Sequence, residues 1–135
     1  AAIEAGANLA IQKAEEGYGL LATGEMGIGN TTSSSAVLSV LSEKPAACVT
    51  GRGAGLSGAG LEQKIRTIDK AIALNQPNPA DAIDILAKVG GLDIAGLTGV
   101  FLGAAAAEFL WLLMDSLRRW QRFWPNSLRR PRRRG

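Results

Sequence analysis

Residues 24–32, GEMGIGNTT, combine closely spaced glycines, one carboxylate and a run of hydroxyl groups. Gly27 and Gly29 allow the backbone to approach an anion, and N–H groups at the start of a following helix favour a phosphate there. Asn30 and Thr31 add side-chain donors. The loop has neither the third glycine of a dinucleotide fingerprint nor the lysine of a P-loop. From spacing alone, a tight turn that leads into a hydroxyl-capped helix is an equally good interpretation.

Other groups could complete a phosphate site. A carboxylate repels an anion, so we expect Glu25 to face a sugar hydroxyl or a ring nitrogen of the ligand. Lys64 follows the glycine-rich segment 51–60 and is a candidate charge partner for phosphate, although a solvated helix lysine is the commoner situation. Gly90 and Gly91 precede a further helical segment, and such a pair usually marks a turn.

The elements that must position these residues alternate along the chain. Hydrophobic periodicity predicts helices in the opening residues and at 30–44, 61–76, 81–90 and 90–107, and short strands at 19–23 and 46–50. Hydroxyl and amide side chains at residues 30–32 are expected to cap the second helix, and Asp81 the fourth. This alternation indicates a partial α/β domain with three layers, in which helices flank a mostly parallel sheet. Ligands in such folds bind beyond the carboxyl ends of the strands.

Composition restricts the class of protein. A chain of 135 residues with 47% apolar content supports one core. Its apolar runs are broken before the roughly 20 residues that a membrane span needs, so we expect no membrane association. Cys48 is the only cysteine and there is no histidine, which argues against an internal disulfide, a Cys-His nucleophile and a zinc site. A reducing cytoplasm is the expected location.

Charge divides the chain near Ala107. Residues 1–107 carry seven Lys or Arg against ten Asp or Glu, whereas residues 108–135 carry eight Arg against two acidic residues and hold all three Trp. A basic, aromatic tail of this kind could bind RNA or an anionic membrane surface.

The motifs GEMGIGNTTSSSA, VTGRGAGL with Lys64 downstream, the turn at 75–79 and DILAKVGGLDIAGLTGVFLGAAAA occur in this order in the nicotinate-nucleotide:dimethylbenzimidazole phosphoribosyltransferases. The chain resembles this family from about Ala2 to Ala107. Members transfer phosphoribose from nicotinate mononucleotide to 5,6-dimethylbenzimidazole, which gives α-ribazole 5′-phosphate and nicotinate for the lower ligand of cobalamin. The resemblance implies an α/β fold with a parallel sheet, a homodimer, and neither a metal nor a cofactor.

The resemblance also implies roles for particular residues. Glu25 is expected to be the catalytic loop carboxylate, in an electrostatic or positioning role. Substrate binding is expected from Gly27, Gly29, Asn30, Thr31, Lys64, Gly90 and Gly91. The family's general-base glutamate and a further phosphate loop, both nearer the C-terminus, have no counterpart here, so a non-catalytic phosphate- or nucleotide-binding module is the alternative function.

The segment 108–135 departs from the family pattern. Members continue with RIPVVVDGF after the alanine run, where this chain has EFLWLLMDS. A codon set for this segment, read one base earlier, encodes RIPVVVDGF. We therefore interpret residues 1–107 as the central part of the domain and residues 108–135 as an out-of-frame tail that is disordered or irregular. Nucleic-acid binding is not expected from it.

Overall fold

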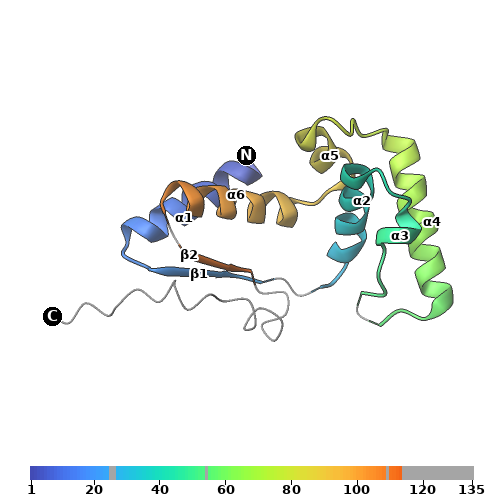
Figure 1. Cartoon of the computed structure of the whole chain (residues 1–135), viewed down its shortest axis with the longest axis horizontal. Coiled ribbons are helices and arrows are strands. Elements are labelled where there is room, and N and C mark those ends of the chain that lie inside the picture. Colours follow the sequence, from blue (N-terminus) through green and yellow to red (C-terminus); the bar gives the residue numbers. More distant parts are fainter. Residues whose placement is uncertain (25–26, 54, 109, 114–135) are drawn as a thin grey trace.

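The computed structural model describes residues 1–24, 27–53, 55–108 and 110–113 (Figure 1). Within these ranges the chain is mostly helical. The elements in order are α1 (Ala2–Glu15), β1 (Leu20–Thr23), α2 (Asn30–Ser42), α3 (Ala46–Val49), α4 (Gly58–Asn75), α5 (Ala82–Val89), α6 (Leu92–Ala106) and β2 (Leu110–Leu113).

The described strands form a two-stranded parallel sheet. β1 pairs with β2, with Leu20 opposite Leu110 and Thr23 opposite Leu113. A parallel pair needs a crossover connection, and here helices α2 to α6 provide it. The predicted parallel pairing is thus present. The predicted arrangement of three layers, with helices on both faces of a larger sheet, is not present in the described residues. The described part of the chain is mainly helical, with a small sheet that α1 and α6 cover on one face (Figure 1).

Strand β2 lies in the segment that we interpret as an irregular tail. Within that segment, residues 110–113 form a strand that pairs with β1. Pairing satisfies backbone groups of β1 that would otherwise be left on an open edge. Residues 114–135 lie outside the described part of the chain.

The second predicted strand is also wrong. Residues Ala46–Val49 form the short helix α3, which begins directly after Pro45. Proline has a φ angle suited to the start of a helix, and the N–H of Cys48 donates to the Pro45 carbonyl. A short apolar run cannot be assigned to strand or helix from periodicity alone. The glycine-rich segment after α3 therefore follows a helix and not a strand. Of the two predicted strand-to-helix connections, only the one from β1 to α2 is present in the described part of the chain.

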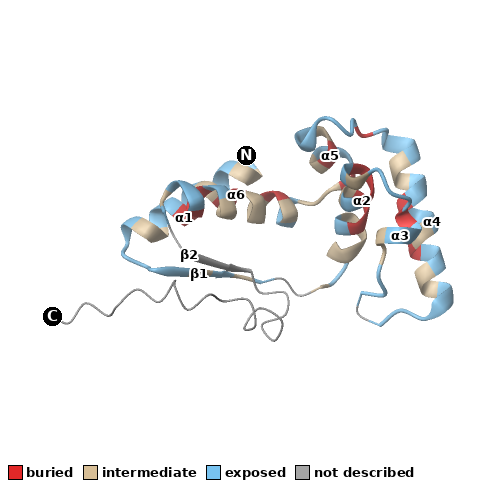
Figure 2. Ribbon diagram, in the orientation of Figure 1, coloured by how far each residue is buried: buried red, intermediate tan, exposed pale blue. Residues whose placement is uncertain are grey.

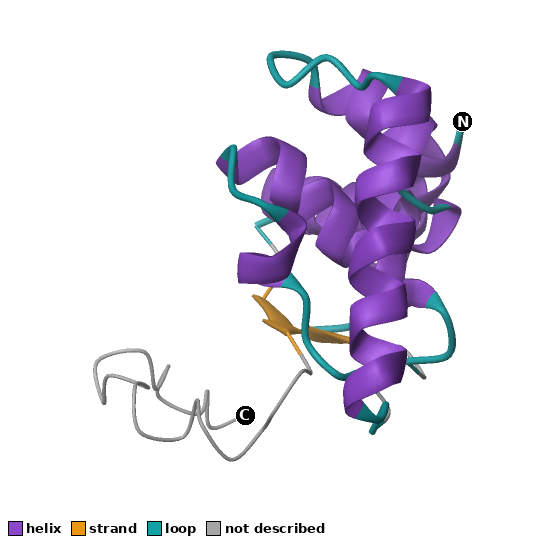
Figure 3. Ribbon diagram, turned by 90° about the vertical axis from the view of Figure 1, so that its right-hand side faces the viewer, coloured by secondary structure: helices purple, strands orange, loops and turns teal. Residues whose placement is uncertain are grey.

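Two apolar clusters hold the described elements together. The first joins α2, α3, α4 and α5 and consists of Ala36, Val40, Ala46, Ile68, Ile85 and Val89. The second joins α1 to α6 through Ala10 and Ala104, with Leu21 of β1 packed against them. Two views agree that α1 and α6 lie over one face of the sheet (Figures 1 and 3). Buried residues occur in both groups of helices (Figure 2).

Helix α4 has the apolar face that its sequence predicts. Ile68 is fully buried, and Leu61, Ile65 and Ile72 on the same stripe are half-buried. Ser57 begins the helix, and its hydroxyl accepts from the N–H of Gly60 at 3.2 Å. The apolar stripe sets the rotation of α4 and therefore the direction of its remaining side chains.

Helices α1 and α6 approach closely because both carry glycines at their crossing. A Cβ atom on Gly99 would lie 1.9 Å from the carbonyl oxygen of Ile3, and one on Gly103 would lie 2.3 Å from that of Ala7. On the other helix, a Cβ on Gly6 would lie 2.0 Å from the carbonyl oxygen of Gly96. The predicted close packing of the small-residue helix is confirmed.

Asp81 caps α5 as predicted. Its Oδ1 accepts from the N–H groups of Ile83 at 2.9 Å and of Asp84 at 3.1 Å. The cap satisfies two donors that a helix start leaves without partners. Helix α5 therefore begins at the predicted place.

Acid should weaken the turn before α5 through Asp84. The N–H of Asn78, which donates to Oδ2 at 2.7 Å, and then the ammonium of Lys88 lower the pKa of the Asp84 carboxyl. A lowered pKa in the folded state gives stability that is present above about pH 4 and is lost as the pH falls through the folded value. Asp84→Asn should therefore flatten the decline of the unfolding free energy below about pH 4. Urea unfolding over a pH series measures this, and an unchanged slope would contradict it.

Candidate phosphate site at the start of helix α2

The turn between β1 and α2 depends on two glycines with left-handed backbone. Gly27 has a φ angle of 81° and Gly29 one of 83°, a region that side chains disfavour. No described atom lies within 4 Å of a Cβ built on either residue, so conformation and not space requires glycine. Both residues occupy the positions predicted for close approach of the backbone to a ligand.

The predicted capping of α2 is wrong. Gly29 is the N-cap, and no side chain of the described residues caps the helix. The hydroxyls of Ser33 and Ser35 donate back to the carbonyls of Asn30 at 2.9 Å and Thr31 at 2.8 Å. Serine in a first turn can make either kind of bond. The helix start therefore presents backbone N–H groups rather than a side-chain cap, an arrangement that favours an anion.

Lys64 crosses from α4 to this helix start. Its side chain is only 8% exposed. The ammonium donates to the hydroxyl oxygen of Thr31 at 2.9 Å and to the carbonyl oxygen of Gly51 at 3.2 Å. The commoner situation of a solvated helix lysine therefore does not apply, and the structure brings two predicted site residues into direct contact.

Within the described ranges, the Lys64 ammonium is buried without a carboxylate partner. Ion pairs between described residues join Glu4 to the N-terminal amine and link Lys13 with Glu16, Arg66 with Glu62 and Lys88 with Asp84. The two described partners of Lys64 are neutral oxygens. A buried charge with only neutral partners is costly, and a nearby anion would offset that cost. The electrostatics of the site favour an anionic ligand.

Gly53 lies next to the contact between Lys64 and Thr31. Its φ angle is 57°, and a Cβ there would lie 2.9 Å from Thr31 Oγ1 and 3.5 Å from Lys64 Nζ. Both its conformation and the space around it require glycine. The glycines of this loop are plain in the sequence, but the sequence did not predict that one of them adjoins the lysine. The neighbouring Arg52 is exposed and donates to the Leu56 carbonyl at 3.3 Å.

The two glycines of the predicted pair, Gly90 and Gly91, have different surroundings. Gly90 ends α5, and a Cβ on it would lie 2.6 Å from the Leu86 carbonyl oxygen, so packing against its own helix explains this glycine. Gly91 begins α6, and a Cβ there would meet Oδ1 of Asp93 on its own helix first and would lie 3.6 Å from the Ser33 hydroxyl. Gly91 thus adjoins the first turn of α2, and its role in substrate binding stays a prediction.

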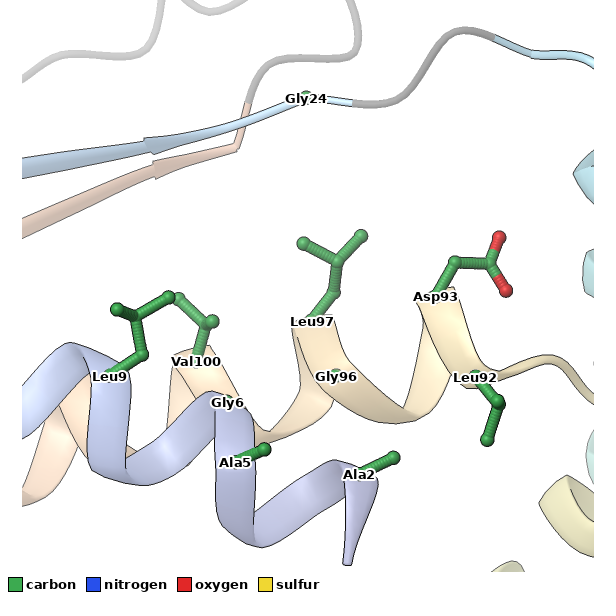
Figure 4. A pocket seen from close by; sticks show the side chains of 10 residues that line it. All are labelled: Ala2, Ala5, Gly6, Leu9, Gly24, Leu92, Asp93, Gly96, Leu97 and Val100. Atoms are coloured by element: carbon green, nitrogen blue, oxygen red, sulfur yellow. The ribbon is translucent and has the colours of Figure 1, made fainter.

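An open pocket of about 480 Å³ lies between α1, α6 and the end of β1. Its lining is mainly apolar and consists of Ala2, Ala5, Gly6, Leu9, Gly24, Leu92, Asp93, Gly96, Leu97 and Val100. In Figure 4 the Asp93 carboxylate and Leu97 point toward the side of Gly24, whereas Leu92 points away. Neither Lys64 nor Thr31 belongs to this described lining, so the pocket is distinct from the lysine contact. Glu25 follows Gly24 but lies outside the described residues, and its role stays a prediction.

A family profile described as phosphoribosyltransferase matches residues 1–117. The chain belongs to this phosphoribosyltransferase family. The resemblance inferred from the loop motifs is confirmed. The matched range extends past the boundary predicted at Ala107 and includes the residues of β2.

Curated relatives agree on the type of phosphoribosyltransferase. The nicotinate-nucleotide–dimethylbenzimidazole phosphoribosyltransferase of Roseiflexus sp. (strain RS-1) is 56% identical over 105 residues, and that of Halalkalibacterium halodurans is 58% identical over 106 residues. Each alignment covers 78% of this chain and 30% of the relative. The chain therefore spans less than a third of the length of these relatives.

A solved structure shares the fold. CobT from Thermus thermophilus superposes with a TM-score of 0.74 at 34% identity, and the match covers 83% of this chain and 33% of that protein. Among the described residues, no helix combines the length and apolar character that crossing a membrane requires.

Proposed function

We propose that the chain forms the phosphate-binding part of an enzyme that transfers phosphoribose from nicotinate mononucleotide to 5,6-dimethylbenzimidazole. The products are α-ribazole 5′-phosphate and nicotinate, for the lower ligand of cobalamin. The observation that carries the proposal is the buried Lys64 ammonium, whose described partners are neutral and which lies at the start of α2. The names of the relatives supply the substrates.

In the proposed reaction the phosphate serves as an anchor. Lys64 and the backbone N–H groups at the start of α2 hold it, which fixes the ribose for attack from the opposite face. The bond from the anomeric carbon to the nicotinate nitrogen breaks as a bond to the benzimidazole nitrogen forms, and positive charge develops on the ribose. Glu25 stabilises that charge or positions the incoming base. The proton of the base passes to a general base, which in the family is a glutamate without a counterpart in this chain.

The proposal extends to assembly and location. By analogy with the family we expect a homodimer in the cytoplasm that binds these two small molecules and no nucleic acid. Large exposed apolar side chains support burial against further protein. They include Leu41 on α2, Leu74 on α4 and Leu92 on α6.

The competing function is a non-catalytic phosphate- or nucleotide-binding module. It is worth testing because the chain aligns with only 30% of its relative's length. Calorimetry with nicotinate mononucleotide and with adenosine monophosphate measures binding, and chromatography after addition of dimethylbenzimidazole measures nicotinate release. We expect preferential binding of nicotinate mononucleotide with weak or no release. Equal affinity for both nucleotides would favour the module, and absence of binding would overturn the proposed function.

We also propose that the reading frame shifts near Ala107. The support is that a codon set for the segment after Ala107, read one base earlier, encodes the family's RIPVVVDGF. Sequencing the gene tests this, because the proposal requires that a single-base shift restores that peptide. A genuine basic tail would instead bind nucleic acid in a manner that weakens steeply with salt.

A further inference from the structure

The contacts of Lys64 determine the direction of its ammonium group. A lysine ammonium has three N–H donors on a flexible stem and no preferred direction of its own. Two acceptors hold it here, the Thr31 hydroxyl at 2.9 Å and the Gly51 carbonyl at 3.2 Å. The ammonium nitrogen is tetrahedral, so two N–H groups held by fixed acceptors also fix the direction of the third N–H. A ligand oxygen that accepts from this third N–H must lie in that direction.

Thr31 is the more rigid of the two acceptors. It lies in the first turn of α2, and its χ1 angle is restricted because threonine is branched at Cβ. Its carbonyl accepts from the Ser35 hydroxyl at 2.8 Å within the same helix. Gly53 also lies against the hydroxyl oxygen, at a distance that leaves no room for a Cβ. The Thr31 oxygen is therefore held in place before any ligand arrives.

We infer that Thr31 is a positioning residue: its hydroxyl oxygen orients Lys64 toward the phosphate of the ligand, and it acts through the lysine. The inference rests on the proposed function, which supplies the phosphate. It assigns Thr31 a role in addition to any direct contact with phosphate, because the hydroxyl oxygen accepts a hydrogen bond from the lysine while the hydroxyl hydrogen is still able to donate. The role requires the oxygen of a hydroxyl and not the methyl group of threonine.

A double-mutant cycle on the full chain separates these roles. The probe is inorganic phosphate, titrated while the amide resonances at the start of α2 are followed by NMR. Thr31→Val removes the acceptor and keeps the shape, and should weaken binding about tenfold, since a hydrogen bond to a charged group is lost. In the Lys64→Met background the same substitution should change binding less than about twofold, because there is no ammonium left to orient.

Matched variants complete the test. Thr31→Ser restores the hydroxyl and should bind within about threefold of wild type. Thr67→Val, at an exposed position of α4 where the hydroxyl donates to the Gln63 carbonyl, should leave binding unchanged. Circular dichroism and urea unfolding show whether each variant folds; if Thr31→Val does not, Thr31→Ala against Thr31→Ser gives the same comparison. An equal loss in both lysine backgrounds, or no loss with Thr31→Val, overturns the inference while the proposed function stands. Failure of the wild-type chain to bind phosphate overturns both.

Discussion

Lys64→Met should weaken the binding of nicotinate mononucleotide about 100-fold, because the substitution removes the charged donor that the site holds for the phosphate. Methionine keeps the unbranched apolar stem, so packing against α2 is largely retained. The contact to Thr31 Oγ1 at 2.9 Å and the low exposure of 8% hold the ammonium at the start of α2. Isothermal titration calorimetry measures the change.

The unfolding free energy of Lys64→Met should differ from that of wild type by no more than about 1 kcal/mol, or should rise. Removal of a buried ammonium relieves a desolvation cost, and this offsets the loss of two hydrogen bonds to neutral oxygens. A residue retained for binding is expected to behave in this way, whereas a residue retained for the fold is not.

Lys70→Met is the matched control for charge and helix position. Lys70 also belongs to α4, but its side chain is exposed. The net charge changes equally in both variants, so a general effect of charge on an anionic ligand would appear in both. Wild-type affinity in Lys64→Met, or equal losses in the two variants, would contradict the role assigned to Lys64.

Gly99→Ala should destabilise the fold by about 2–3 kcal/mol, because the added methyl group overpacks the crossing of α1 and α6. A Cβ at this position would lie 1.9 Å from the carbonyl oxygen of Ile3 and 2.9 Å from the backbone nitrogen of Ala7. Both are backbone atoms, which cannot rotate away as the end of a side chain can. The two helices must therefore separate and lose part of their contact.

Gly96→Ala on the same helix is the control. No atom of the described residues lies within 4 Å of a Cβ built on Gly96. Alanine has the higher helix propensity, so this variant should gain up to about 1 kcal/mol. Urea unfolding followed by circular dichroism compares the two alanine variants with wild type. Equal stability of Gly99→Ala and Gly96→Ala would show that the close crossing does not hold the helices together.

Local sequence patterns were sufficient where a local interaction decides the structure. The apolar stripe of α4 around Ile68, the Asp81 cap and the glycine backbone at Gly27 and Gly29 were all predicted. Periodicity, capping and left-handed backbone depend on residues within a few positions of one another. Local patterns failed for α3, where four apolar residues after a proline suit either a strand or a helix.

The sequence by itself determined the family, the glycine turn before α2 and the presence of candidate groups for a phosphate site. The tertiary structure alone decided which of those groups meet. Lys64 and Thr31 are separated by 33 positions, and the packing of α4 against α2 places the ammonium on the hydroxyl. The same packing places Gly53 beside this contact and Gly90 against Leu86 of its own helix. The burial of Lys64, which makes its charge favour an anion, was also decided by the tertiary structure. Burial depends on what packs around a side chain and not on its neighbours in the sequence.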